Sequence, residues 1–118
     1  MNPIAQRFYD EAESHSQKPV LADESISFRG IHLTVLPDIY SEKPNYFELQ
    51  FDLLSNMSTY AKLIFENLPG LNLNYRSFAK EAASHLGGNE YSVVLTDWTV
   101  HLKREFDVNY LTLQRTAR

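Results

Sequence analysis

The chain has 118 residues, of which 43% are hydrophobic and 22% charged, a balance that predicts one globular domain and argues against a disordered or fibrous protein. It contains no Cys, so disulfides, thiolate metal sites and a Cys nucleophile are excluded. The net charge of −4 arises in the N-terminal half. Nucleic acid and anionic membranes are disfavoured as partners, because both need clustered Lys and Arg side chains.

Residues 1–10 lack the basic segment and apolar run of a signal peptide, and no stretch approaches the length of a transmembrane helix. We therefore expect a cytoplasmic protein that does not bind membranes. Aromatic residues make up 13% of the chain, and seven of them are Tyr. Tyr combines a large contact area with a polar tip, which is typical of interfaces and ligand pockets as well as of small cores.

The first predicted element is an amphipathic helix within residues 1–15. Asn2 and Pro3 are typical of a helix start, and apolar residues then recur at helical spacing to about Ser14. Residues 16–24 are interpreted as a linker between this helix and the rest of the single domain, residues 1–118.

Two strands are predicted next. Residues 25–36 form the first, although its apolar alternation changes phase at Gly30, which suggests a bulge or a sharp bend. Residues 46–54 form the second, where Phe and Leu alternate with polar residues as in a strand with one face in the core. The intervening loop, residues 38–45, is longer than a tight turn and contains Tyr40, a candidate binding residue.

Two helices should follow these strands. The first occupies residues 55–68 and ends at Pro69, and the second begins after the capping residue Asn74 and ends near Leu86. The remaining residues favour two long strands that reverse near residues 104–107, because β-branched and aromatic residues are dense there. A helix over residues 96–106 is the alternative, since Trp98, Leu102 and Phe106 are spaced four apart.

The predicted fold class is α+β. We expect a curved antiparallel sheet of about four strands with helices packed on one face, in the order helix, strand, strand, helix, helix, strand, strand.

The segment 90–103 has apolar residues at both odd and even positions, which predicts a strand that is apolar on both faces. The even set is Val94, Trp98, Val100 and Leu102, and the odd set is Tyr91, Val93 and Leu95. A small sheet normally covers one face, so a second apolar face would need a helix, a ligand or another chain.

This pattern favours a non-catalytic protein-interaction module of the inhibitor, immunity, chaperone or adaptor type. We expect it to bind a protein partner or a second copy of itself, as a homodimer, through the second face of the C-terminal strands. The candidate binding residues are Tyr91, Val93, Leu95, Leu111 and Leu113, together with Tyr40.

Signatures of catalysis are absent. No Gly-rich loop opens a helix and no paired His suits a metal, so no cofactor and no metal are expected. The polar half of residues 90–103 carries Asp97, Thr99, His101 and Lys103. The alternative function is therefore a small-molecule-binding protein or a modest acid/base enzyme, with an aromatic-lined cup in the curved sheet and His101 and Asp97 at its floor.

Overall fold

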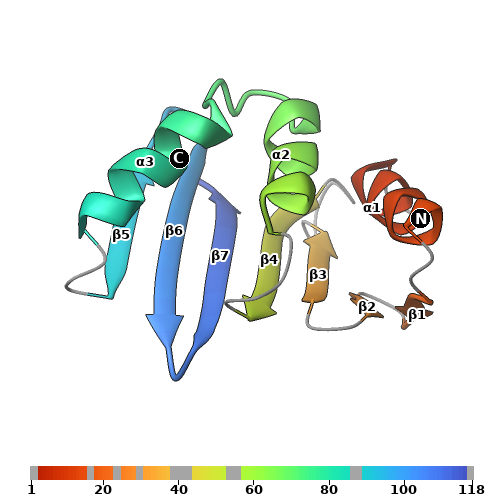
Figure 1. Ribbon diagram of the computed structural model, residues 1–118. Coiled ribbons are helices and arrows are strands. Elements are labelled where there is room, and N and C mark those ends of the chain that lie inside the picture. Colours follow the sequence, from red (N-terminus) through yellow and green to blue (C-terminus); the bar gives the residue numbers. More distant parts are fainter. Residues whose placement is uncertain are drawn as a thin grey trace.

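The computed structural model describes residues 3–15, 18–22, 25–28, 31–37, 44–52, 57–85 and 89–116. Over these ranges the chain forms three helices and seven strands (Figure 1). In chain order they are α1 (Pro3–Ser14), β1 (Val20–Leu21), β2 (Ser25–Phe28), β3 (Ile31–Pro37), β4 (Pro44–Asp52), α2 (Met57–Asn67), α3 (Tyr75–His85), β5 (Glu90–Val94), β6 (Trp98–Glu105) and β7 (Val108–Arg115).

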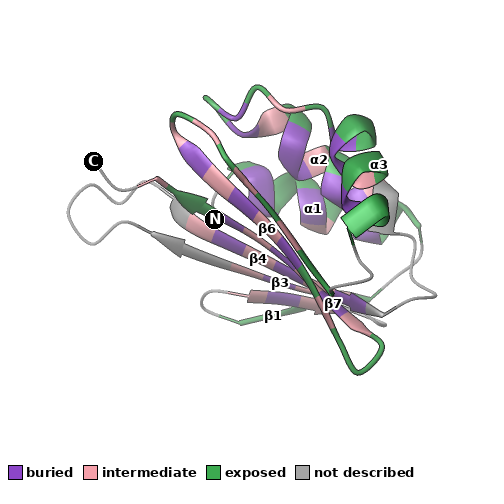
Figure 2. Ribbon diagram, turned by 90° about the vertical axis from the view of Figure 1, so that its left-hand side faces the viewer, coloured by how far each residue is buried: buried purple, intermediate pink, exposed green. Residues whose placement is uncertain are grey.

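All seven strands belong to one antiparallel sheet with the order β1-β2-β3-β4-β7-β6-β5. The sheet consists of two meanders, β1 to β4 and β5 to β7, which join where β4 pairs with β7. The chain between the two meanders contains α2 and α3. The helices lie on one face of the sheet and leave the other face open (Figures 1 and 2).

The hydrophobic core lies between the sheet and the helices. Phe47, Leu49 and Phe51 on β4 are buried, whereas Glu48 and Gln50 between them are half-exposed, so the predicted alternation on this strand is confirmed. On the neighbouring strand, Leu111 pairs with Leu49 and Leu113 pairs with Phe47. Burying each of these side chains contributes about 1.5–3 kcal/mol, so the seam between the two meanders is a major source of stability.

The helices follow the predicted apolar stripes. The buried residues of α1 are Ile4, Ala5, Phe8 and Ala12, and those of α3 are Tyr75, Phe78 and Ala82. Asn74 caps α3 as predicted, because its Oδ1 accepts a hydrogen bond of 3.1 Å from the Ser77 N–H. The helices of the described chain are all too short to cross a membrane.

The prediction of about four strands is wrong, and so is the predicted element order. The segment 25–36 is two antiparallel strands, β2 and β3, and the segment 90–103 contains β5 and most of β6. A further strand, β1, lies within the predicted linker, residues 16–24. The helix alternative for residues 96–106 is also wrong, because β6 occupies most of that range.

The two segments each predicted to form one strand, residues 25–36 and 90–103, are divided for the same physical reason. A change between even and odd apolar positions predicts a bulge at Gly30 and a second apolar face in residues 90–103. In the structure the chain reverses at each change, so Ile26 pairs with Leu33 and Tyr91 pairs with Leu102. Directly paired residues of antiparallel strands point to the same face, so Trp98, Val100 and Leu102 share the core face with Tyr91, Val93 and Leu95, whereas Val94 lies on the open face. Gly30 itself lies outside the described residues.

Candidate functional site

The candidate binding residues of the C-terminal strands lie on the helix-covered side of the sheet. Leu111 and Leu113 are fully buried, and Tyr91, Val93 and Leu95 are half-buried against the core. The Tyr91 ring stacks on His85 of α3 at a centroid distance of 4.8 Å. The interpretation of a second apolar face is therefore wrong, since these side chains lie on the helix-covered face and pack against the core. Tyr40 lies outside the described residues.

The two residues of the alternative acid/base site are not brought together. His101 lies on the open face of β6, where its Nε2 is 2.8 Å from Glu90 Oε1. Asp97 lies in the turn between β5 and β6, and its carbonyl accepts a hydrogen bond of 2.9 Å from the Thr116 N–H. Asp97 also lies close to Gly70. A Cβ added at Gly70 would be 3.0 Å from Asp97 Oδ2. The structure therefore does not bring His101 and Asp97 together at the floor of one cup.

The open face of the sheet is polar. At its centre, Glu48 accepts hydrogen bonds from the Tyr46 hydroxyl and from Gln50 Nε2. Burial, this hydrogen bond and the charge of Glu48 raise the pKa of Tyr46 above its ordinary value. Within the described ranges, no group of three His, Cys, Asp or Glu residues could hold a metal ion. One solvated polar face is the usual state of an antiparallel sheet.

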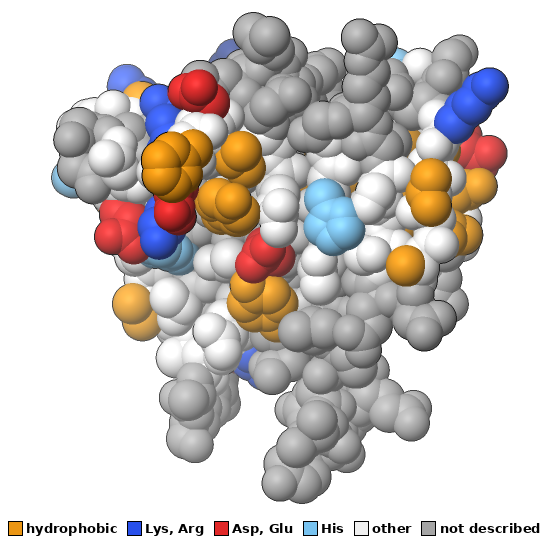
Figure 3. All heavy atoms as spheres, turned by 90° about the horizontal axis from the view of Figure 1, so that it is seen from below, with side chains coloured by type: hydrophobic (Ala, Val, Ile, Leu, Met, Phe, Trp, Pro, Cys, Tyr) orange, Lys and Arg blue, Asp and Glu red, His pale blue; other side chains and the backbone are white. Residues whose placement is uncertain are grey.

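The large exposed hydrophobic side chains of the described chain lie at the borders of the sheet. Val20 and Leu21 are on β1, Val94 is on β5, and Phe106 is in the turn between β6 and β7. In the view from below, hydrophobic side chains gather at the left among Lys, Arg, Asp and Glu side chains (Figure 3). Exposed apolar groups at an edge strand are unusual, because edges are normally protected against pairing with other chains.

The two edges of the sheet are protected to different degrees. β1 has two residues and follows Pro19, and a very short strand beside Pro is a common protection of an edge. β5 has five residues, contains neither Pro nor Lys, and ends at Val94, which is 72% exposed. The sheet therefore has one short edge and one longer edge that is open to pairing.

Two backbone hydrogen bonds fix which groups of β5 point outward. The Leu95 N–H donates to the Trp98 carbonyl at 2.8 Å, and the Arg104 N–H donates to the Asn89 carbonyl at 2.9 Å. In an antiparallel pair, every second residue directs both backbone groups to its neighbour. Residues 89, 91, 93 and 95 thus face β6, and Glu90, Ser92 and Val94 direct their N–H and C=O groups to the open edge.

Sequence reasoning missed this edge because it treated residues 90–103 as one strand. The turn at residues 95–97 contains Leu, Thr and Asp but no Gly or Pro, so the usual turn signal is absent. Asp97 directly before Trp98 was the only local sign of a turn. Compared with protein-family models, curated proteins and solved structures, the chain has no match.

Proposed function

We propose that the chain is a non-catalytic protein-interaction module that self-associates by pairing its β5 edge with the β5 edge of a second copy. The observation that carries this proposal is the open five-residue edge with outward backbone groups at Glu90, Ser92 and Val94. An unprotected edge strand is a template for one more strand, and a second copy supplies the same strand in antiparallel orientation.

The residues of β5 favour one register. In a two-fold arrangement centred on Ser92, Glu90 lies opposite Val94 of the second copy, and Tyr91 lies opposite Val93. Every outward backbone group of β5 then finds a partner, which gives about six intermolecular hydrogen bonds. The two Glu90 carboxylates are kept apart, and Val94 gains a neighbour. A shift by one residue would point the helices of the two copies to opposite sides, so it is disfavoured.

The expected affinity is modest. Each hydrogen bond contributes about 1 kcal/mol net, so about six correspond to a dissociation constant of about 10–100 µM. The loss of translational and rotational freedom opposes binding, while contact between apolar side chains such as Tyr91 and Val93 supports it. The dimer should therefore form and dissociate with concentration.

The test is the substitution Ser92→Pro. Proline removes the N–H at the centre of the outward edge, and it leaves the hydrogen bonds between β5 and β6 in place because the Ser92 N–H points away from β6. Sedimentation velocity over about 5–300 µM should show a concentration-dependent dimer for the wild type and a monomer for Ser92→Pro.

Ser92→Ala is the matched control, because it removes the hydroxyl and keeps the N–H. It should dimerise like the wild type, and the melting temperature of each variant checks that the fold is retained. A wild type that stays monomeric at the highest concentration would overturn the proposal. A Ser92→Pro protein that dimerises as strongly as the wild type would do the same.

A further inference from the structure

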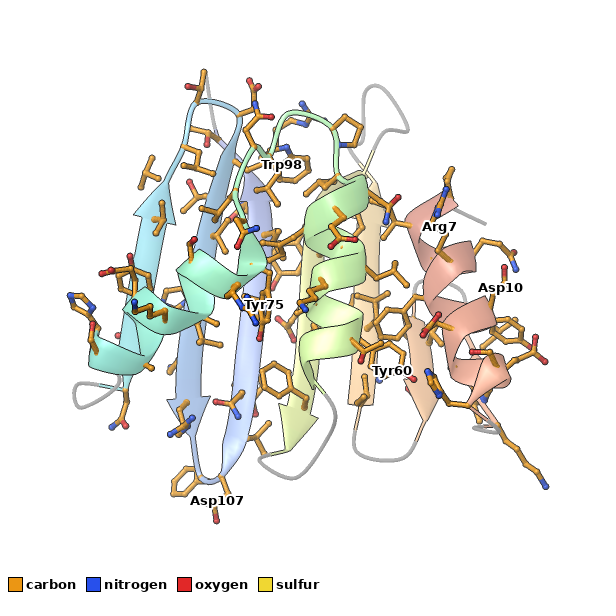
Figure 4. All side chains as sticks on the ribbon, turned by 45° about the horizontal axis from the view of Figure 1, so that its top comes forward. Arg7, Asp10, Tyr60, Tyr75, Trp98 and Asp107 are labelled. Carbon is orange, nitrogen blue, oxygen red and sulfur yellow. The ribbon has the colours of Figure 1, made fainter. Side chains whose placement is uncertain are left out.

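A second feature lies away from the β5 edge, in the space between α3 and the sheet. A pocket of about 180 Å³ opens there, with an almost entirely apolar lining. Phe51, Tyr75, Phe78, Ala82, Leu102 and Leu111 form most of its wall. Figure 4 shows Tyr75 at the start of α3, between that helix and α2 and above the sheet. The short side chains of Ala82 and its neighbours on α3 leave this space unfilled.

Two polar side chains, Asn109 and Arg104, interrupt the apolar wall. Asn109 of β7 pairs with Phe51 of β4 and with Arg104 of β6, so it occupies a core-facing position that alternation would fill with an apolar residue. Asn109 is only 3% exposed, and in the described part of the chain it is the one buried polar residue. Burying an amide is unfavourable without hydrogen-bond partners. Asn109 therefore needs a hydrogen-bond partner at this buried position.

Arg104 supplies the charge at this pocket. Its Nε donates a hydrogen bond of 3.1 Å to Asn109 Oδ1, which fixes the guanidinium beside the pocket. No described carboxylate forms an ion pair with Arg104. The terminal nitrogens of its guanidinium also donate no hydrogen bond to a described residue. A guanidinium next to an apolar pocket is complementary to an anion with an apolar body.

We propose that this pocket binds a small aromatic or branched aliphatic monocarboxylate. The apolar body occupies the space under α3, and the carboxylate accepts hydrogen bonds from the terminal nitrogens of Arg104. The size agrees with this class, because a cavity of about 150 Å³ lined by apolar side chains holds a benzene ring. Drug-sized ligands need pockets of about 300 Å³ or more, so larger acids are disfavoured. This site goes beyond self-association and does not depend on it.

Benzoate is the probe, and benzyl alcohol is its uncharged counterpart. Titrations of the full chain followed by amide chemical shifts should show both compounds perturbing α3 and β6. Arg104→Gln should raise the dissociation constant of benzoate about tenfold or more, because it removes a charge-assisted contact, and should leave that of benzyl alcohol unchanged. Ala83 is an exposed residue of α3 at the pocket wall, and Ala83→Leu places a larger side chain there. This substitution should weaken the binding of both compounds.

Arg76→Gln is the matched control, because it removes an exposed Arg of α3 that does not line this pocket. It should bind benzoate like the wild type. The proposal is overturned if benzoate at millimolar concentration does not perturb the wild type. It is also overturned if Arg104→Gln or Ala83→Leu, with an unchanged melting temperature, binds benzoate as the wild type does.

Discussion

At the scale of single residues, the turn between β6 and β7 contains residues that its backbone conformation disfavours. Phe106 and Asp107, the central residues of the β6–β7 turn, have φ values of 50° and 65°, and Phe106 is 91% exposed. Figure 4 shows Asp107 at the far end of this hairpin. Two positive φ values define a turn that favours Asn-Gly, and a bulky residue in the left-handed region costs about 1–2 kcal/mol. The turn is formed against local preference and depends on the pairing of β6 with β7.

Replacing the two turn residues should stabilise the protein. Phe106→Asn combined with Asp107→Gly places residues that tolerate positive φ at both positions and so relieves the backbone strain. We expect the free energy of unfolding to rise by about 1–2 kcal/mol. Urea unfolding at neutral pH measures it. Phe106→Leu keeps the strain and serves as the control, and equal stability of the double variant and the wild type would contradict the interpretation.

Position 70 requires a glycine for two reasons. Its φ is +81°, and a Cβ there would come within 3.0 Å of Asp97 Oδ2. Gly70→Ala should therefore lower the free energy of unfolding by about 1–2 kcal/mol. Adding Asp97→Ala removes the close contact but not the backbone strain, so a double-mutant cycle should show partial recovery. Additive effects of the two substitutions would show that the contact plays no part.

At the scale of elements, the helices are held by aromatic contacts with one another and with the sheet. The Tyr75 ring of α3 meets the Phe65 ring of α2 edge to face at a centroid distance of 5.3 Å. Trp98 of β6 is buried under the connection between the two helices, and its Nε1 donates a hydrogen bond of 3.0 Å to the Pro69 carbonyl (Figure 4). The two helices are thus held together by this ring pair, and the link between them is fixed onto β6 at Pro69.

Tyr75 should make the stability fall at alkaline pH. Burial raises the pKa of Tyr75 from 10.0 to about 12, so the folded state retains a proton that the unfolded state loses first. The stabilisation is fully present below pH 10 and should be lost as the pH rises from 10 to about 12. Denaturant unfolding across this range measures the slope, and Tyr75→Phe should reduce it. A slope that Tyr75→Phe leaves unchanged would assign the effect to the other tyrosines.

At the scale of the whole molecule, two meanders share one core through the β4–β7 seam. Leu49 and Leu111 pair across it, and both are buried. Because each meander needs the other to complete its apolar face, we expect the two halves to unfold together in one transition. The β5 edge is at the far border of the second meander, so pairing with a second copy would extend the sheet without disturbing the seam.

Leu49→Ala tests this cooperativity. The cavity that this substitution leaves in the core should lower the free energy of unfolding by about 2–5 kcal/mol, while the transition stays single. Gln50→Ala, on the open face of the same strand, should change it by about 0.5 kcal/mol or less. Fluorescence of Trp98 reports the second meander and circular dichroism reports the whole chain. Separate midpoints from the two signals would contradict the prediction.

The sequence by itself determined the helices and the central strand. The apolar spacing from Pro3 to Ser14, the cap at Asn74 and the alternation around Leu49 are local patterns with one matching geometry each. Such patterns depend on the period of the element alone, so they could be recognised before any long-range contact was known.

Only the tertiary structure decided which face and which edge each strand presents. Alternation records on which side a residue lies within one strand, but a chain reversal exchanges odd and even positions, and the turn at residues 95–97 carries no Gly or Pro to mark it. The open edge at β5 depends on the order of strands in the sheet. The pairing of Arg104 with Asn109 beside an apolar pocket likewise depends on the register of β6 against β7 and on where α3 packs. These are contacts between distant segments, which no local pattern encodes.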